Sequence, residues 1–574
     1  MPFIEDNTLP EDNQLPVSPY SNSFQDRIKD LTQKTFILIL IAIVIKIFGL
    51  VRTSFTATIF GATTTLDMFF GIFGSTIVFF EVLPTAFNQA LVPRYIELLV
   101  KGDRKGFNRA VSTSINYVLV LAIIVFIVCA YYAAPIRKLF FQFPLDTPSN
   151  VTTYANWLFR LAFAVLFMNV FIGSFTAILY SHDQVISPSI LNFINGINVL
   201  IAMLLLHDRF IPGTTTQFGI FSMVLGYLTG GLCQIVYLAI IALRTGFKWH
   251  PLVFEGGKGF LEYVKPIGPA YLALVMGQLN IVIDRGFTSR LEDAAGQISL
   301  LQYAGQMILI ILIFSTAFSN AILPKLSSTK SMNRPDEYKI LLVRGIMVIL
   351  LLVLPIAISA FLTARPLTAL ILFHGEFASN PRNVLITVNI FRIMIVWSIL
   401  FLINTQFLNV FYTYKDFRLP FIISSVGVLV NIYFNMLLSG ITFGLPVKAL
   451  AHWGVIGITA STALGICISL ILSVTLLRGK IGSILDMDLF KQIAKLGIPS
   501  VFALGIGYLF NWQVFFVRYH GVSAGTWFSL LQVLAVGFVT FTVFWYVSYL
   551  VNRDRMVFLY KILRGLITFR RRTS

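Results

Sequence analysis

Residues 85–94 read TAFNQALVPR, and residues 316–325 read TAFSNAILPK. Almost the same spacing, about 231 residues, relates the Phe-Arg pair at 159–160 to the Phe-Arg pair at 391–392. Internal similarity at a fixed spacing indicates a duplicated structural unit. Each unit contains six apolar segments, an even number, so the two copies have the same orientation. The repeat therefore predicts two halves related by an axis along the membrane normal, an arrangement typical of transporters.

The composition supports a membrane location for this duplicated unit. Of the 574 residues, 57% are hydrophobic and 12% are charged, with a mean hydropathy of +0.82. A soluble domain has about 45–50% apolar and about 25% charged residues. The excess excludes a soluble enzyme, a disordered chain and a fibrous protein. The three cysteines lie far apart inside apolar stretches, which is typical of neither a disulfide framework nor a metal site.

Apolar windows of about 20 residues predict the membrane-spanning helices. We expect an all-α integral membrane protein of about 14 such helices, in two pseudo-symmetric six-helix lobes followed by two C-terminal helices. The predicted spans are 35–51, 66–92, 110–134, 154–180, 186–206, 218–243, 261–283, 297–323, 345–363, 385–411, 419–440, 449–476, 492–510 and 525–550. The predicted domains are an N-lobe at 35–243, a C-lobe at 244–480 and the last two helices at 481–550.

The distribution of basic residues predicts the orientation. The 43 Lys and Arg residues give a net charge of +18, which in a membrane protein reflects cytoplasmic loops rather than nucleic-acid binding. They are about three times as frequent on the side of the termini, so we expect both termini in the cytoplasm. Residues 1–34 are predicted to form a disordered cytoplasmic tail without a cleavable signal. The basic tail 551–574 is either an orientation signal alone or a segment that also binds anionic lipids.

The sequence lacks the patterns of an enzyme. The six histidines are scattered, without a metal-binding pair, and no Gly-rich phosphate loop indicates ATP hydrolysis. We therefore expect no catalytic activity and no cofactor or metal. Uphill transport would draw on an ion gradient or on the membrane potential, which supplies about 2.3 kcal/mol per charge per 100 mV.

Charged residues inside predicted spans are the first candidates for a binding site, because they are costly in lipid unless they face a cavity or a partner. Lys46 and Arg52 share one face of the first helix with Gly49, Asp67 opens the second helix, and Glu81 lies in its middle. Lys46 also fits a side chain that extends to the membrane surface, and Arg52 with Asp67 also fits a structural ion pair. Glu81 is too deep for the first alternative.

Uncharged polar residues and one further arginine complete the candidate site. Asn88 and Gln89 lie in the second predicted helix, Gln306 lies in the eighth, and Arg285 ends the seventh. Hydrogen bonding between helices is the structural alternative for the polar residues. A group of cations facing a water-filled cavity suits an anionic substrate, and arginine is well shaped to bind a diphosphate.

These residues occur in motifs that resemble the MurJ/MviN family of lipid II flippases, within a larger superfamily of multidrug, oligosaccharidyl-lipid and polysaccharide exporters. The resemblance runs in order from about residue 35 to about residue 480. It rests on the following segments: Lys46-x-x-Gly49-x-x-Arg52, Ile59-Phe60-Gly61-Ala62, Asp67-x-Phe69-Phe70, Phe87-Asn88-Gln89-Ala90-Leu91-Val92-Pro93, Val282-Ile283-Asp284-Arg285, Leu301-Gln302-Tyr303-Ala304 and Phe411-Tyr412 with Lys415-Asp416 and Pro420.

The resemblance implies a flippase of the bacterial inner membrane that moves the peptidoglycan precursor lipid II from the cytoplasmic to the periplasmic leaflet by alternating access. It implies a cationic cavity formed mainly by helices 1, 2, 7 and 8, and a groove for the polyprenyl tail formed by helices 13 and 14. Arg52 and Asp67 match cavity positions of the family, and Lys46 matches a position that commonly holds arginine. Membrane lipids and the lipid-linked saccharide are the implied partners.

The chain departs from the family pattern at two places. Phe79-Phe80 stands where the family can place an arginine pair, and Gly305-Gln306 stands where it has an arginine. Arg285 and Arg392 are candidates to replace the missing cations. Three alternatives therefore stay open: a flippase for another polyprenyl-diphosphate-linked glycan, a membrane scaffold that transports nothing, and a cation-coupled drug antiporter.

Overall fold

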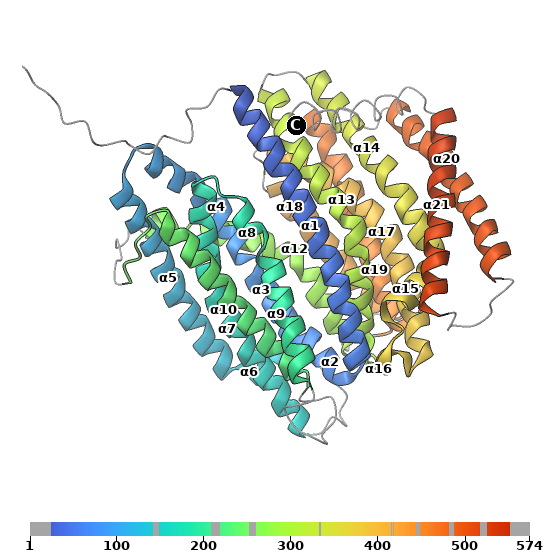
Figure 1. Ribbon diagram of the computed structural model, residues 1–574, viewed down its shortest axis with the longest axis horizontal. Helices are drawn as coiled ribbons and strands as arrows, with labels where there is room; N and C mark the ends of the chain where they lie inside the picture. Colours follow the sequence, from blue (N-terminus) through green and yellow to red (C-terminus); the bar gives the residue numbers. More distant parts are fainter. Residues whose placement is uncertain are drawn as a thin grey trace, which may run out of the picture.

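The computed structural model describes residues 24–141, 149–207, 219–251, 260–331, 335–414, 416, 418–442, 448–481, 487–516 and 525–551. Within these ranges the chain is a bundle of helices without strands (Figure 1). Among the described residues, 13 helices are long and apolar enough to cross a membrane. Helix α13 (Gln297–Ser331) occupies the eighth predicted span, 297–323, with a shorter apolar stretch over Gln297–Ile313. The predicted all-α membrane fold is confirmed, with the number of spans approximate.

The first half of the chain contains six membrane crossings, and the second crossing is divided into four pieces. Its elements are α1 (Phe24–Phe60), α2 (Thr64–Met68), η1 (Phe69–Gly74), α3 (Ser75–Glu81), α4 (Leu83–Val100), α5 (Arg104–Tyr131), α6 (Ala133–Phe140), α7 (Ser149–Ser181), α8 (Ile186–Ser189), α9 (Leu191–Leu206) and α10 (Phe221–Arg244).

The divisions of the second crossing have local causes. Helix α2 begins after Thr63, whose hydroxyl accepts a hydrogen bond from the Leu66 amide and so satisfies a free donor of the first turn. Element η1 is π-helical, a geometry that usually occurs as a single widened turn inside an α-helix. Pro84 lies in the first turn of α4, where its missing N–H is tolerated, and the turn at Val82 separates α4 from α3. Glu81 therefore ends a helix inside the bundle.

The second half repeats the six crossings, and two further helices follow it. Its elements are η2 (Phe260–Val264), α12 (Ile267–Thr288), α13, α14 (Pro335–Leu362), α15 (Ala364–Leu372), α16 (Gly375–Ala378), α17 (Pro381–Thr413), α18 (Arg418–Ser439) and α19 (Gly454–Ile481). The C-terminal elements are α20 (Met487–Asn511), η3 (Trp512–Phe516) and α21 (Thr526–Val551). In Figure 1, α20 and α21 lie beside the second half, where both pack on α14 and α21 also packs on α15.

Helix α1 connects the two halves. It packs on α9 of the first half and on α13, α15 and α16 of the second half (Figure 1). One hydrophobic cluster extends through both halves, and a second joins the second half to α20 and α21. Side chains on α1 therefore lie where they can contact both halves.

The described ends of the chain lie on the same side of the bundle. The start of α1 and the end of α21 point toward one end of the molecule in Figure 1, and α2 and α16 lie at the opposite end. Helix α1 begins at Phe24, so part of the segment predicted to be disordered, 24–34, is helical. The rest of that predicted tail, 1–23, and nearly all of the basic tail, 552–574, lie outside the described residues.

Candidate functional site

The structure contains a cavity of about 580 Å³ between α1 and the other helices of the first half. Side chains from α1, α3, α4, α7, α9 and α10 line it, and α13 of the second half adds Gln306 and Leu309. This volume lies in the range of about 300–1,000 Å³ that is typical of ligand sites. Tyr180 and Pro188 line the cavity near the connection from α7 to α9, which by the order of the crossings lies on the side of the chain ends.

The α1 wall of the cavity carries two cations. Lys46 and Arg52 both line the cavity with Gly49 between them, as their spacing on one helix face predicts. Both side chains are half-buried, and Arg52 lies close to Gly196, where an added Cβ would be 3.9 Å from its Nη1. The wall thus offers hydrogen-bond donors with full positive charge, and a guanidinium can bind a phosphate through two parallel bonds.

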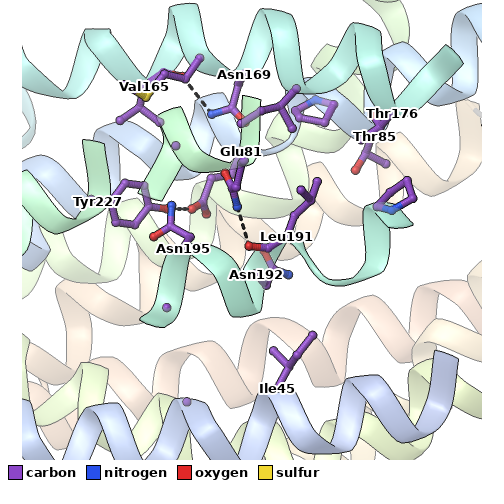
Figure 2. Close-up of a pocket in the computed structure, with 18 of the residues that line it drawn as sticks. Ile45, Glu81, Thr85, Val165, Asn169, Thr176, Leu191, Asn192, Asn195 and Tyr227 are labelled. Carbon is purple, nitrogen blue, oxygen red and sulfur yellow. Dashed lines mark hydrogen bonds between the residues drawn. The ribbon is translucent and has the colours of Figure 1, made fainter. Parts of the chain in front are cut away.

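The opposite wall carries a carboxylate (Figure 2). Glu81 is exposed into the cavity from the end of α3, and its Oε1 accepts a hydrogen bond from the hydroxyl of Tyr227 on α10. Asn195 of α9 lies beside this pair in Figure 2. Tyr227 and Asn195 were not singled out from the sequence, because a tyrosine or asparagine in an apolar span carries no distinctive pattern. The depth of Glu81 was the available signal that a polar partner had to lie nearby.

The predicted site residues divide into two groups. Lys46, Arg52, Glu81, Asn88 and Gln306 line the cavity. Asn88 accepts a hydrogen bond of 3.4 Å from the Thr176 hydroxyl of α7. Gln89, Asp67 and Arg285 lie outside the cavity lining, and helix α12, predicted as a wall, contributes no lining residue among those described. The side chain of Gln89 is exposed.

Asp67 joins the two halves of the molecule. It is 2% exposed, and its Oδ1 accepts hydrogen bonds from the Ser299 amide at 2.7 Å and the Ser299 hydroxyl at 2.6 Å. Ser299 lies in the first turn of α13, where a negative charge also interacts favourably with the helix dipole. The ion pair with Arg52 that the sequence left open does not occur, because the carboxylate is bound by Ser299 instead.

Two further contacts close the same end of the molecule. The Tyr303 hydroxyl of α13 donates a hydrogen bond of 2.6 Å to the Gly61 carbonyl after α1. Gly375 has a φ of +50°, and a Cβ there would lie 2.3 Å from the carbonyl oxygen of Thr58 on α1. A glycine is thus required where α16 approaches α1. Contacts between the halves therefore hold together the end that contains α2 and α16, and the cavity lined by Lys46 and Arg52 lies toward the other end.

Arg285 also contacts the first half, at the π-helical turn. Its Nη1 donates to the Phe70 carbonyl at 3.0 Å and to the Ser75 hydroxyl at 3.2 Å, and its Nη2 donates to the Gln302 Oε1 at 2.6 Å. The side chain is 7% exposed. Its hydrogen bonds join α12 to η1, α3 and α13, so this geometry supports a structural role rather than the predicted place among the ligands of the substrate.

A second polar cluster lies inside the second half, around Asp284. This buried carboxylate accepts hydrogen bonds from Asn431 at 2.9 Å, Asn435 at 3.1 Å and Thr462 at 2.7 Å. The Oδ1 atoms of both asparagines are buried without a hydrogen-bond partner within the described part of the chain. Asp284 was predicted to lie near the end of the seventh helix. Its partners, Asn431 and Asn435 in α18 and Thr462 in α19, are far away in the sequence and could not be inferred.

The comparisons with known proteins agree with this architecture. The family model described as "Lipid II flippase MurJ" matches residues 56–522. A probable lipid II flippase MurJ of Buchnera aphidicola subsp. Schizaphis graminum is 24% identical over 391 residues, which are 67% of this chain and 73% of the relative. A probable lipid II flippase MurJ of Borreliella burgdorferi is 22% identical over 485 residues, 82% of this chain and 88% of the relative.

Solved structures show the same fold. A lipid II flippase MurJ in an inward closed conformation has a TM-score of 0.72 at 20% identity, over 90% of this chain and 99% of that chain. An inward-facing multidrug resistance MATE family transporter has a TM-score of 0.58 at 13% identity, over 78% of this chain and 94% of that chain. Because the family model covers most of the sequence, the chain belongs to the lipid II flippase MurJ family.

Proposed function

We propose that this protein moves lipid II from the cytoplasmic to the periplasmic leaflet of the bacterial inner membrane by alternating access. The observation that carries the proposal is the pair of cations, Lys46 and Arg52, on one wall of a cavity inside the membrane-spanning bundle. A diphosphate crossing the membrane needs compensating charge, because the hydrocarbon core solvates no anion. The cations and amides of the cavity replace the interactions with water that the headgroup loses.

The contacts at one end and the position of the cavity toward the other support alternating access. Asp67, Tyr303 and Gly375 hold the halves together at one end, and the cavity extends toward the end that bears the described chain ends. The excess of Lys and Arg supports a cytoplasmic location for the latter end and for both termini. In this orientation the structure corresponds to a state that is closed toward the periplasm. Transport then requires the Asp67–Ser299 contact to open and a closing contact to form on the cytoplasmic side.

The two lobes and the C-terminal helices have separate roles in the proposal. The lobes, 35–243 and 244–480, rock against each other around the headgroup, and helices α20 and α21 accommodate the polyprenyl tail. Both helices expose large apolar side chains along their length, including Val501, Leu509, Leu534 and Phe538. Such side chains suit contact with a hydrocarbon chain.

Coupling to an ion gradient is the part of the proposal that involves Asp284. The amide nitrogens of Asn431 and Asn435 face the Asp284 carboxylate, and the Oδ1 atoms of both asparagines are buried and unpartnered among the described residues. Together with the carboxylate and the Thr462 hydroxyl, these amides can supply the hard oxygen ligands that small cations prefer. Asp284→Asn should remove any stimulation of transport by the coupling cation in proteoliposomes, while the protein remains folded. If transport by this variant responds to cation gradients as the wild type does, the coupling resides elsewhere or in the membrane potential.

The alternative functions predict different measurable outcomes. A flippase for another polyprenyl-diphosphate-linked glycan would also use Arg52 but would fail to replace a lipid II flippase, whereas a scaffold would not need Arg52 for any transport. A drug antiporter has an expected preference for cationic substrates, which the Lys46 and Arg52 wall opposes.

The decisive experiment is complementation of a bacterium depleted of its own lipid II flippase. The wild-type chain should restore growth, Arg52→Ala should abolish growth at equal expression, and Arg52→Lys should restore it in part, because lysine keeps the charge without the paired donors. Arg160→Ala is the matched control, because Arg160 is an exposed arginine in α7 that stacks near Trp157 outside the cavity lining. Full growth with Arg52→Ala would refute the proposed diphosphate site.

A further inference from the structure

The wall of the cavity opposite α1 contains a carboxyl group and several amide oxygens, which is unexpected for a site that binds only an anion. Figure 2 shows this wall, with Glu81, Tyr227, Asn169 and Asn195 on one side of the cavity and Ile45 of α1 on the other. The α1 side supplies donors, from Lys46 and Arg52. The two walls therefore differ in chemistry as well as in position.

The orientation of two amides follows from their partners. The Nδ2 of Asn169 donates to the Val165 carbonyl at 3.0 Å, and the Nε2 of Gln234 donates to the Leu191 carbonyl at 2.6 Å. A backbone carbonyl only accepts hydrogen bonds, so the nitrogen of each amide must face it. Each side chain lines the cavity and keeps its oxygen as an acceptor, together with the second N–H of its amide. The Oδ1 of Asn195 is buried and has no hydrogen-bond partner among the described residues.

Glu81 adds an ionisable carboxyl group to this wall. Its described hydrogen-bond partner is the single O–H of Tyr227, which leaves most of the acceptor capacity of the carboxylate unused. Its side chain is exposed into the cavity, and neither Lys46 nor Arg52 forms an ion pair with it among the described residues. An ionised carboxylate in this position repels a diphosphate, and Arg52 and Arg285 interact electrostatically with it and offset part of that repulsion. A ligand that also carries a positive charge would turn the remaining repulsion into attraction.

We infer that the wall formed by Glu81, Tyr227 and the neighbouring amide oxygens binds a primary ammonium group on the headgroup of the substrate. This inference rests on the proposed function and narrows it to a headgroup with charges of both signs, with the diphosphate at Lys46 and Arg52 and the ammonium at Glu81. An ammonium group has three donors and no acceptor, which matches the Glu81 carboxyl group and the amide oxygens beside it. Neutral sugar hydroxyls would find partners here too, but they do not require a carboxylate.

The test compares two forms of one ligand. Purified protein in nanodiscs is titrated with lipid II whose peptide carries a free primary amine, and with the same lipid after N-acetylation of that amine. The wild type should bind the free amine more tightly by on the order of tenfold, as expected for a hydrogen-bonded charge in a cavity. Glu81→Gln, which keeps the shape and removes the charge, should bind the two forms equally. Glu81→Asp should retain part of the preference.

The control variants separate this inference from the proposed function. Arg52→Ala should weaken binding of both forms, because both carry the diphosphate, and Arg160→Ala should change neither. If the wild type binds both forms equally while Arg52→Ala loses both, the ammonium site is refuted and the diphosphate site stands. The ammonium site is equally refuted if Glu81→Gln keeps the wild-type preference. If the wild type binds neither form, the proposed function itself fails. Thermal unfolding of each variant checks that it is folded.

Discussion

Replacing Arg285 by glutamine tests whether this arginine holds the structure together or binds the substrate. The side chain is 7% exposed and donates hydrogen bonds to the Phe70 carbonyl, the Ser75 hydroxyl and the Gln302 Oε1. The change removes the guanidinium and leaves these neutral acceptors without their donor. We expect a less stable protein whose affinity for the substrate is nearly unchanged.

The size of the effect follows from the bonds that are lost. A hydrogen bond to a charged group contributes about 1.5–3 kcal/mol, so three such bonds give a ceiling of about 5–9 kcal/mol. The ceiling is not reached, because burial of the guanidinium itself costs free energy that the glutamine does not. The Phe70 carbonyl and Gln302 are the acceptors that lose most, at about 1–2 kcal/mol for each stranded group. We therefore expect a loss of about 2–4 kcal/mol in the free energy of unfolding.

Thermal unfolding in detergent, followed by tryptophan fluorescence, measures this loss as a decrease of several degrees in the midpoint. Gln302→Leu alone and combined with Arg285→Gln completes a double-mutant cycle, and the two residues should couple by about 1–2 kcal/mol. Arg382→Gln is the matched control, since Arg382 is exposed at the start of α17. A variant Arg285→Gln that melts like the wild type but loses affinity for lipid II would contradict this argument and return Arg285 to the substrate site.

Three further expectations concern the closed end, a charged loop and the orientation. In a cysteine-free background that carries Thr65→Cys as the probe, Asp67→Asn should increase labelling of the cysteine by a membrane-impermeant reagent. The reason is that the contact between the halves loses the charge-assisted hydrogen bonds from Ser299 to Asp67. Unchanged labelling would contradict this expectation. The hydrogen bond from Lys480 holds the pKa of Asp416 below its ordinary value. At a pH above the pKa that Asp416 has in the unfolded chain, the carboxylate therefore stabilises the fold. This stabilisation is lost as the pH falls through the lower pKa of the folded state. Asp416→Asn should accordingly flatten the acid side of the stability profile, and an identical profile would be evidence against it. Lys101→Cys should react only from the cytoplasm and Ser379→Cys only from outside, and the reverse pattern would invert the topology.

The sequence was sufficient for the spans because the membrane imposes a length of about 20 apolar residues on each. The ends of the helices were predicted less well, since polar turns continue a helix beyond the apolar core without a change in hydropathy. Helix α1 begins at Phe24 rather than near residue 35, and α14 begins at Pro335 rather than near residue 345. A hydropathy window detects the apolar residues that lie in lipid, and it does not detect polar helical turns outside the lipid.

The candidate site was predictable only where the information was local. Lys46 and Arg52 share a helix face by their spacing alone, and the structure places both at the cavity. Asp67 and Arg285 were assigned to the same site because they are charges in or near spans. Their partners, Ser299 for Asp67 and Phe70 for Arg285, lie more than 200 positions away in the sequence. Charge in a span indicates that a partner exists, but only the fold determines whether that partner is a helix end, a carbonyl or a ligand.

The second crossing connects these separate features, because one divided helix carries all of them. Asp67 in α2 binds the start of α13 at the closed end, the Phe70 carbonyl in η1 accepts from Arg285, and Glu81 ends α3 at the cavity. A π-helical turn and a break at Val82 interrupt this crossing between Asp67 and the start of α4, and such π-helical turns are frequent at functional sites. A shift of this crossing therefore alters the closing contact and the cavity wall together. We expect departure of Asp67 from Ser299 to be accompanied by a change in the position of Glu81, because both residues lie on this one crossing, and alternating access requires such coupling.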